Sequence, residues 1–96
     1  MIVLWLPGAQ LTRMAQIDFI ARDNPAAALT QDQRLEAQVD RLVRHPELGR
    51  TGRIKGTREL VVSRTPFVVI YRVRSELKRV EILRVLHVAQ HWPRQA

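Results

Sequence analysis

Residues 57–88 read TRELVVSRTPFVVIYRVRSELKRVEILRVLHV, and this segment largely determines the architecture we expect. Three runs within it, residues 57–63, 66–73 and 80–88, are rich in Val, Ile, Leu and aromatic residues, which favour strands. The links between these runs, residues 64–65 and 74–79, have the length of hairpin connections. The segment therefore predicts an antiparallel meander of three strands.

The N-terminal region predicts one strand followed by a helix. Residues 2–6 form a short apolar run that ends at Pro7-Gly8, and a run of this length fits a buried strand better than a helix. Pro7 is compatible with the first turn of the helix that follows, because a missing N–H costs nothing there. Apolar residues recur at helical spacing as far as about Arg22; they are Leu11, Met14, Ile17, Phe19 and Ile20.

A second helix is predicted after Asp23. The residue before a proline avoids helical backbone angles, so the first helix ends by Asn24. Asn24 is a favourable N-cap for a helix that begins with Pro25. This second helix continues to near His45-Pro46 along one apolar stripe, which consists of Ala28, Leu35, Val39 and Leu42. Two amphipathic helices with so short a joint predict an antiparallel helical hairpin.

These elements give an α+β fold in a single domain of residues 1–96. The N-terminal strand and the three-stranded antiparallel meander form one sheet, and the helical hairpin covers one face of it. Residues 45–56, between the hairpin and the meander, contain Pro46 and three glycines, which is typical of a loop. Three cationic residues make this loop basic: Arg50, Arg53 and Lys55.

The charge of the chain is unevenly distributed. Of 96 residues, 16 are Lys or Arg and 9 are Asp or Glu, so the formal net charge is +7. Residues 1–45 hold five basic and five acidic side chains, so the whole excess belongs to residues 46–96. Fourteen of the basic residues are Arg, the type suited to bidentate contacts with phosphate or carboxylate. A basic surface that meets an anionic partner is therefore expected.

Composition excludes several classes of protein. The chain has no cysteine, which excludes a disulfide framework, a thiol nucleophile and a zinc site that uses Cys. Its longest apolar run, MIVLWL, is too short to span a bilayer and follows no basic segment, so we expect neither a signal peptide nor a membrane anchor. A soluble, cytoplasmic protein without a metal or other cofactor is the expectation.

Two arginines interrupt apolar strands. Arg72 and Arg84 fall in the middle of the second and third runs, where a buried, unpaired guanidinium would be costly. One interpretation is that they pair across strands with Glu59 and Glu81. The other is that Arg58, Arg72 and Arg84 line an anion-binding site open to solvent. Strand alternation would place Val80, Ile82, Arg84 and Leu86 on one side of the third strand.

The three histidines are not equally good candidates for a functional role. His45 ends a helix and His87 fits the edge of the core, so structural roles are the simpler interpretation of both. His91 lies beyond the last strand beside Trp92, close to the basic surface, and is the best candidate proton donor or acceptor. His87 and His91 have a spacing that could bind a metal only on a helix, and no third ligand is evident.

Aromatic residues and the glycine-containing loop offer weaker candidates. Tyr71 and Trp92 could stack on a nucleic-acid base, although core packing is the simpler role for Tyr71. Residues 49–53 contain two glycines and two arginines but lack the spacing and the following helix of a phosphate-binding loop. RNA cleavage would need a base, an acid and cationic stabilisation of the phosphorane. Arginines supply the last, and His91 is the plausible acid or base, with Lys55 or Arg58 as poor substitutes.

Nearly the whole chain resembles one known superfamily. The order of strand, two helices and three strands is similar to that of the RelE/ParE superfamily of toxins from type II toxin–antitoxin modules. The residues of the matching segments most resemble those of the ParE-like branch. The segments that carry the resemblance are DNPAAA at 23–28, HPELGR at 45–50, GR at 52–53, GTRELVV at 56–62, TPFVVIYRV at 65–73, VEILRVLH at 80–87 and QHWP at 90–93.

The resemblance implies a growth-inhibiting bacterial toxin that is neutralised by an antitoxin whose acidic C-terminal segment wraps the helices and sheet. A toxin–antitoxin hetero-oligomer would result. ParE-like members act on DNA gyrase, whereas RelE-like members cut mRNA on the ribosome with basic residues and a C-terminal Tyr or His. Lys55, Arg58, Arg84 and His91 loosely match those residues, but Trp92 takes the place of the Tyr and has no hydroxyl. This departure favours the gyrase branch.

The sequence therefore predicts a ParE-like toxin that inhibits DNA gyrase, in a plasmid or chromosomal module. A metal-independent, ribosome-dependent endoribonuclease and a non-toxic binding module that keeps the fold are the alternatives. If the chain cleaves RNA, the catalytic residues are Arg58, Arg84 and His91. The residues predicted to contact the target are Arg50, Arg53, Lys55, Arg58, Arg72 and Trp92.

Overall fold

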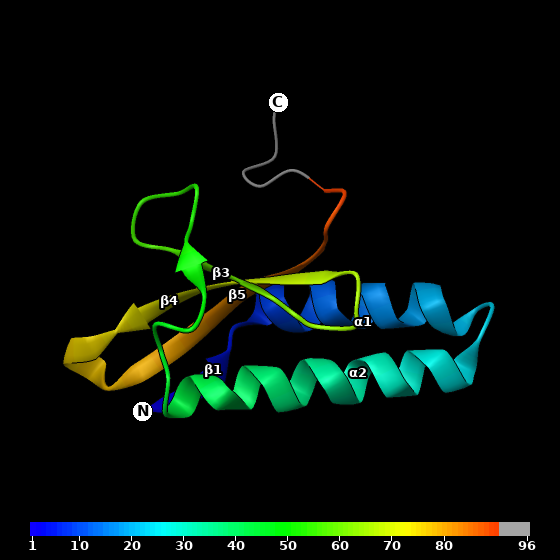
Figure 1. Cartoon of the computed structure of the whole chain (residues 1–96), viewed down its shortest axis with the longest axis horizontal. Coiled ribbons are helices and arrows are strands. Elements are labelled where there is room, and N and C mark those ends of the chain that lie inside the picture. The colour runs from blue at the N-terminus through cyan, green and yellow to red at the C-terminus, as the bar shows by residue number, and fades with distance from the viewer. Residues whose placement is uncertain (91–96) are drawn as a thin grey trace.

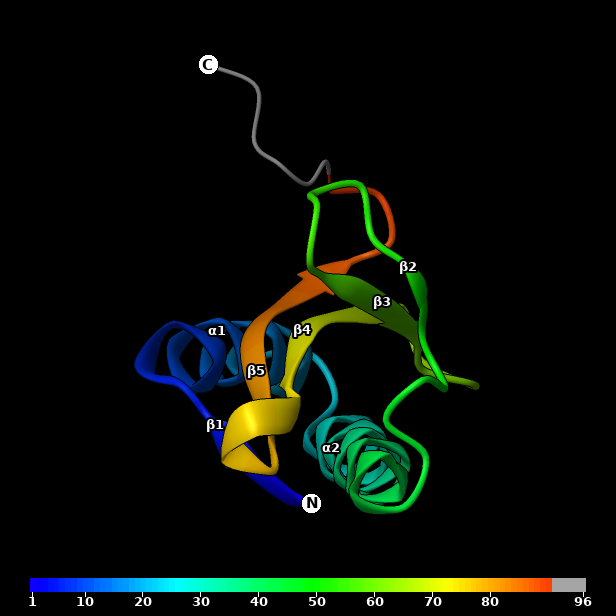
Figure 2. The ribbon, with the colours of Figure 1, turned by 90° about the vertical axis from the view of Figure 1, so that its left-hand side faces the viewer.

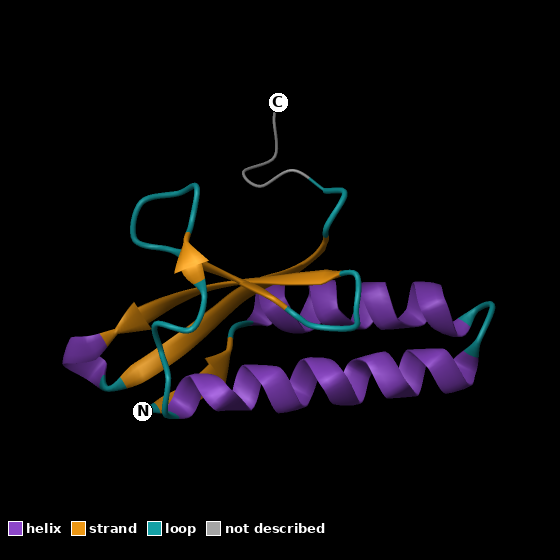
Figure 3. Ribbon diagram, viewed as in Figure 1, coloured by secondary structure: helices purple, strands orange, loops and turns teal. Residues whose placement is uncertain are grey.

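Two antiparallel helices cover one face of a five-stranded sheet in a computed structural model of the chain, which describes residues 1–90 (Figure 1). The joint between the helices lies at the opposite end of the molecule from the turn that joins the last two strands (Figure 3). In chain order the elements are β1 (Ile2–Trp5), α1 (Pro7–Ala21), α2 (Pro25–Asp40), a 3₁₀ turn (Arg41–Val43), β2 (Arg50–Thr51), β3 (Arg58–Val61), β4 (Phe67–Arg74), a second 3₁₀ turn (Ser75–Leu77) and β5 (Arg79–His87).

The strand order is β1-β5-β4-β3-β2, with β1 parallel to β5 and the other neighbours antiparallel. The α+β class, the N-terminal strand, the helical hairpin and the meander are as predicted. The two-residue strand β2 was not expected. It pairs Arg50 with Glu59 and Thr51 with Arg58, and so short a strand between glycines has no alternating pattern by which to recognise it.

Helix α2 begins where the sequence predicts and ends earlier. The Asn24 side chain accepts a hydrogen bond of 3.0 Å from the Ala27 N–H, and Pro25 occupies the first turn. The α-helical geometry stops at Asp40 and gives way to the 3₁₀ turn, so the predicted continuation to His45 is too long by a turn. Helix α1 starts at Pro7 after an extended Leu6 that supplies no side-chain cap.

The core lies between the hairpin and the sheet. Ala9 of α1 and Leu35 and Val39 of α2 are fully buried against the meander. The strand residues in this cluster alternate along each strand, as one face of a sheet requires, except for a step of three residues from Ile82 to Val85 in β5. They are Leu60, Val62, Phe67, Val69, Tyr71, Val80, Ile82 and Val85.

One irregularity changes the faces of β5. Ile82 pairs with Tyr71 and Arg84 pairs with Ile70, so Leu83 has no partner and forms a bulge. The predicted grouping of Arg84 with Ile82 is therefore wrong, because the extra residue moves Val85 onto the core face and Arg84 onto the opposite one. Simple alternation of apolar residues does not reveal such an insertion.

No helix within residues 1–90 combines the length and the apolar character that crossing a bilayer requires.

Candidate functional site

The sheet has one face without helices, which we call the open face. The side chains on it alternate with the core residues, and they include Glu59, Val68, Ile70, Arg72 and Glu81. The loop between β2 and β3 rises on this side of the molecule, opposite the two helices (Figure 2). Much of the positive charge of the second half of the chain therefore belongs to this face and its surroundings.

A buried carboxylate holds three arginines at one end of the open face. Glu81 is only 2% exposed, and its Oε1 accepts a hydrogen bond of 2.6 Å from Nε of Arg72, its partner on β4. Its Oε2 lies 2.6 Å from a terminal nitrogen of Arg79, and a nitrogen of Arg74 lies 3.7 Å from Oε1. The hydrogen bond from Arg72 lowers the pKa of Glu81. One negative charge thus orients three partly exposed positive charges.

A second buried carboxylate holds the basic loop. Glu59 accepts hydrogen bonds of 3.0 and 3.3 Å from the Arg50 guanidinium and one of 3.1 Å from the backbone N–H of Arg53. The Glu59 side chain is buried, whereas that of Arg50 is exposed. Glu59 therefore fixes both β2 and the first residues of the loop that carries Arg53 and Lys55.

Beside the second cluster, on the side away from Glu81, lies an apolar strip with a small hollow. Val68, Ile70 and Leu86 supply apolar surface to its lining, and Arg53 and His87 line it as well. Nδ1 of His87 accepts a hydrogen bond of 3.1 Å from the Ala89 N–H, which leaves Nε2 to carry the proton in the neutral ring. His87 and Glu59 thus supply an imidazole and a carboxylate to the lining of this hollow, beside Arg50 and Arg53.

Arg58 lies away from the open face. It pairs in register with the core residue Tyr71, and its guanidinium donates hydrogen bonds of 2.8 Å to the carbonyl of Gly49 and 3.4 Å to that of Glu47. The structure therefore does not bring Arg58 together with Arg72 and Arg84. Its contacts instead stabilise the loop before β2.

Arg84 lies at the edge of β5, beside the bulge. It donates a hydrogen bond of 2.6 Å to the carbonyl of Leu83, and its guanidinium occupies the space beside Gly8 in the first turn of α1. A Cβ at Gly8 would lie 1.9 Å from an Arg84 nitrogen, so a side chain at this position would displace the guanidinium. The guanidinium of Arg84 therefore lies against α1, whereas that of Arg72 pairs with Glu81 on the open face.

The remaining predicted residues fall in two groups. Arg53 and Lys55 are exposed in the loop between β2 and β3. His91 and Trp92 lie outside the described residues. Within residues 1–90, no three His, Cys, Asp or Glu side chains come close enough together to hold a metal ion.

Tyr71 packs in the core and is not available for stacking on a base. Its hydroxyl donates a hydrogen bond of 2.7 Å to the carbonyl of Pro46 and accepts one of 2.8 Å from the N–H of Gly49. Burial raises the pKa of this phenol. Tyr71 therefore ties the loop before β2 to the centre of the sheet.

Sequence reasoning missed two features. Arg74 and Arg79 join Arg72 around Glu81, and the two-residue spacing of Arg79 and Glu81 on one strand would have revealed their shared face. Helix α1 also exposes part of its apolar residues: Leu11, Met14 and Phe19 are each between 60% and 68% exposed. Large exposed apolar side chains on one helix commonly mark an interaction surface.

Comparisons with known proteins are consistent with this geometry. Residues 3–92 match the family model described as the ParE toxin of the type II toxin–antitoxin system parDE. A protein of Sinorhizobium fredii (strain NBRC 101917 / NGR234), named "Putative toxin Y4kP", is 43% identical over 84 residues, which are 86% of this chain and 84% of that protein. The fold is similar to a solved chain of the chromosomal ParDE toxin–antitoxin system from P. aeruginosa, with a TM-score of 0.80, 30% identity, and coverage of 91% of this chain and 95% of that one.

Proposed function

We propose that this chain, which belongs to the ParE family of toxins of type II toxin–antitoxin systems, arrests bacterial growth. It does so by inhibiting DNA gyrase in the cytoplasm. The observation that carries the choice of target is the chemistry of the open face. Its charged groups are arginines oriented by Glu59 and Glu81, which suits binding to an anionic surface.

General acid–base chemistry has weaker support on this face. Arginine stays protonated at any physiological pH, so it stabilises negative charge but does not shuttle protons. Glu59 and Glu81 already accept several hydrogen bonds from cations and backbone. Of the described histidines, His87 lies nearest this chemistry, and its Nδ1 is occupied. This favours inhibition by binding over ribosome-dependent mRNA cleavage.

The proposal includes a cognate antitoxin that neutralises the toxin. The exposed apolar residues of α1 offer a surface for an amphipathic partner helix, and the net charge of +7 favours a partner with acidic residues. A toxin–antitoxin hetero-oligomer is the expected resting state.

Expression of the chain alone in a bacterial host tests toxicity, with normal growth contradicting it. The purified protein is then added to gyrase and relaxed plasmid, and separately to a translation system that contains ribosomes and mRNA. We expect loss of supercoiling and no translation-dependent cuts. Cuts without any effect on gyrase would instead favour the endoribonuclease.

His91→Ala separates these two activities further. A gyrase inhibitor does not need a proton donor at this position, so the variant should remain fully toxic. Loss of toxicity in a folded His91→Ala variant, together with mRNA cleavage by the native chain, would assign His91 a catalytic role.

A further inference from the structure

Three arginines surround one buried carboxylate where β4 ends and β5 begins, beside the turn at one end of the sheet (Figure 1). The side chains of Arg72, Arg74 and Arg79 are between 34% and 41% exposed, whereas that of Glu81 is 2% exposed. We call these four residues the arginine cluster. A partner that approaches this end of the sheet therefore meets guanidinium groups, and the carboxylate that orients them is covered.

The arginine cluster has hydrogen-bond donors that the described part of the chain does not use. Arg72 donates to Glu81 through Nε, so the four N–H groups of its terminal nitrogens form no hydrogen bond within residues 1–90. Arg74 likewise donates through Nε, to Glu76, and one of its terminal nitrogens lies 3.7 Å from Glu81. A guanidinium held at Nε presents its terminal nitrogens as a fork, which matches two oxygens of a phosphate or a carboxylate.

The charge at this end of the sheet is positive even after the ion pairs are counted. Residues 72–81 contain four basic side chains, the fourth of which is the exposed Lys78, and two acidic ones, so their formal charge is +2. Of the two acidic side chains, Glu81 is buried and Glu76 is paired with Arg74 at 2.7 Å. The charge that remains accessible attracts an anion.

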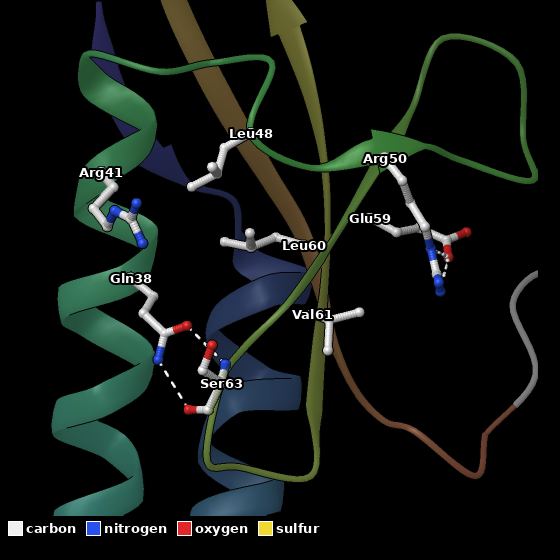
Figure 4. A pocket seen from close by; sticks show the side chains of 8 residues that line it. All are labelled: Gln38, Arg41, Leu48, Arg50, Glu59, Leu60, Val61 and Ser63. Carbon is white, nitrogen blue, oxygen red and sulfur yellow. Dashed lines mark hydrogen bonds and ion pairs between the residues drawn. The ribbon is translucent and has the colours of Figure 1, made fainter.

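A second group of positive charge lies on the same face, too far away for one small anion to contact both. Arg50 pairs with the buried Glu59, and Figure 4 shows both side chains on the side of β3 that faces away from α2. Glu59 pairs in register with Ile70, two residues before Arg72 on β4, and Arg72 pairs with Glu81. The spacing and rise of the strands therefore separate the backbones of the two glutamates by about 12 Å. An extended polyanion can contact both groups at once.

Duplex DNA fits these observations better than an acidic protein surface. Its backbone carries one negative charge per about 1.7 Å of helix axis, so a stretch of about 12 Å presents about seven phosphates. A ligand of such uniform charge meets no repulsion here, because the two carboxylates described on this face, Glu59 and Glu81, are both buried. Arginine side chains contact phosphates irrespective of the base sequence.

We propose that the arginine cluster binds the phosphodiester backbone of the duplex DNA on which gyrase acts. Arg72 and Arg74 donate to phosphate oxygens through their terminal nitrogens, and Lys78 and Arg79 add positive charge beside them. Arg50 contacts phosphates further along the same duplex, and the apolar strip is left for contact with gyrase itself. The inference rests on the proposed function for the choice of DNA as the ligand, whereas the anion site rests on the geometry of the cluster.

Binding of the purified chain to DNA in the absence of gyrase tests the site directly. The probe is a fluorescently labelled duplex of about 20 base pairs, and its anisotropy is measured between about 50 and 200 mM salt. We expect a dissociation constant on the order of micromolar that rises steeply with salt, because phosphate contacts release counterions. Duplexes of different sequence should bind equally well.

Arg74→Gln and Glu76→Gln should change this affinity in opposite directions. The first removes a donor and leaves Arg72 and Arg79 on Glu81, so binding should weaken about fivefold and the salt slope should fall by about one. The second removes an exposed carboxylate and frees Nε of Arg74, so binding should strengthen by a similar factor. Arg74→Lys keeps the charge without the fork, so it should retain the salt slope and lose only part of the affinity.

Arg22→Gln and Asp40→Asn are the matched controls, because they make the same two changes of charge at exposed positions of the helical hairpin. Both should bind DNA as the native chain does. Matching melting temperatures establish that each variant folds. If the controls change the affinity as much as the cluster variants do, net charge rather than this site governs binding, and the inference is wrong.

The inference is also wrong if the native chain does not bind the duplex, or if Arg74→Gln and Glu76→Gln bind it with native affinity. Displacement of the labelled duplex by a polyglutamate peptide as readily as by unlabelled DNA would overturn the choice of phosphate and indicate an acidic protein surface as the ligand. A chain that binds DNA through the cluster but leaves supercoiling by gyrase unaffected contradicts the proposed function instead.

Discussion

At the scale of single residues, the buried carboxylates explain how a chain of net charge +7 keeps its arginines ordered. Glu81 contacts three guanidinium groups that would otherwise repel one another at the end of the open face. Such charge-assisted hydrogen bonds are stronger than neutral ones, and they orient donors as well as stabilising the fold. Glu81 is therefore a positioning residue for the arginine surface.

The depressed pKa of Glu81 predicts a specific dependence of stability on pH. Because the folded-state pKa lies below the ordinary value of 4.5, the unfolded chain binds this proton more readily. The contribution of Glu81 is thus fully present above pH 4.5 and is lost as the pH falls through the folded-state value. In Glu81→Gln, we expect a lower melting temperature at pH 7 and a smaller further decrease on acidification.

The matched control for this prediction is Glu76→Gln. Glu76 pairs with Arg74 at 2.7 Å but is largely exposed, and exposed ion pairs contribute little to stability. Thermal melts of both variants between pH 3 and pH 7 make the comparison. Equal effects of the two substitutions would contradict the role assigned to Glu81.

At the scale of elements, the sequence predicted the helices and strands that have a long repeating pattern of apolar residues or a strong local signal. The alternating residues of β4 and the Asn24-Pro25 start of α2 are of this kind, and both are confirmed. The bulge at Leu83 and the two-residue strand β2 are determined by tertiary pairing and leave no periodic trace. The same limit applies to the candidate site.

Sequence reasoning identified Arg72 and Glu81 as a possible cross-strand pair, and the structure contains that pair. It could not separate Arg58 from the open face, because the loop that Arg58 contacts is placed by Tyr71 from a distant strand. Nor could it foresee that Arg84 would lie beside Gly8, since the bulge sets the direction of that side chain.

Tyr71 connects β4 to the loop before β2, and Tyr71→Phe should loosen that loop. The substitution leaves the Gly49 N–H and the Pro46 carbonyl without their partner, which costs about 1–3 kcal/mol of unfolding free energy. The raised pKa of Tyr71 adds a second, pH-dependent effect on stability. The neutral phenol stabilises the folded chain below the ordinary pKa of 10.0, and this contribution to stability is lost as the pH rises above that value. Tyr71→Phe should lack this loss at alkaline pH.

Urea denaturation measures the change in stability, and amide hydrogen exchange locates it. We expect faster exchange at Gly49 in Tyr71→Phe. The Gly52 N–H donates a hydrogen bond of 2.8 Å to the Thr57 carbonyl. It is the internal reference and should exchange at the same rate in Tyr71→Phe as in the native chain. Unchanged exchange at Gly49 would mean that the hydroxyl does not hold the loop.

At the scale of the whole molecule, charge and apolar surface are segregated. Residues 1–45 are formally neutral, and four of their exposed apolar residues, Leu11, Met14, Phe19 and Leu29, lie on the helical hairpin, whereas the second half supplies the arginines of the open face. Since the helices and the open face lie on opposite sides of the sheet, a target and an antitoxin can contact different surfaces (Figure 2). The net charge opposes neither role, because both partners are expected to be anionic.

This segregation predicts that toxicity and neutralisation can be separated by mutation. The double substitution Arg53→Glu and Lys55→Glu reverses two exposed charges of the loop between β2 and β3. The buried Glu59 keeps its partner at this position, because it accepts from the backbone N–H of residue 53 and not from the side chain. This variant should lose growth inhibition and still bind the antitoxin. Leu11→Asp with Met14→Asp changes the exposed side of α1, and this variant should remain toxic but escape neutralisation.

Growth on induction with and without the antitoxin, together with binding of the purified proteins, distinguishes the outcomes. Arg22→Glu with Arg44→Glu makes the same change of net charge at exposed positions away from the open face, and it should stay toxic. If this control abolished toxicity as well, total charge rather than a defined surface would govern the action on the target. If the α1 variant lost toxicity while remaining folded, target and antitoxin would share the helical surface, and neutralisation would be direct competition for it.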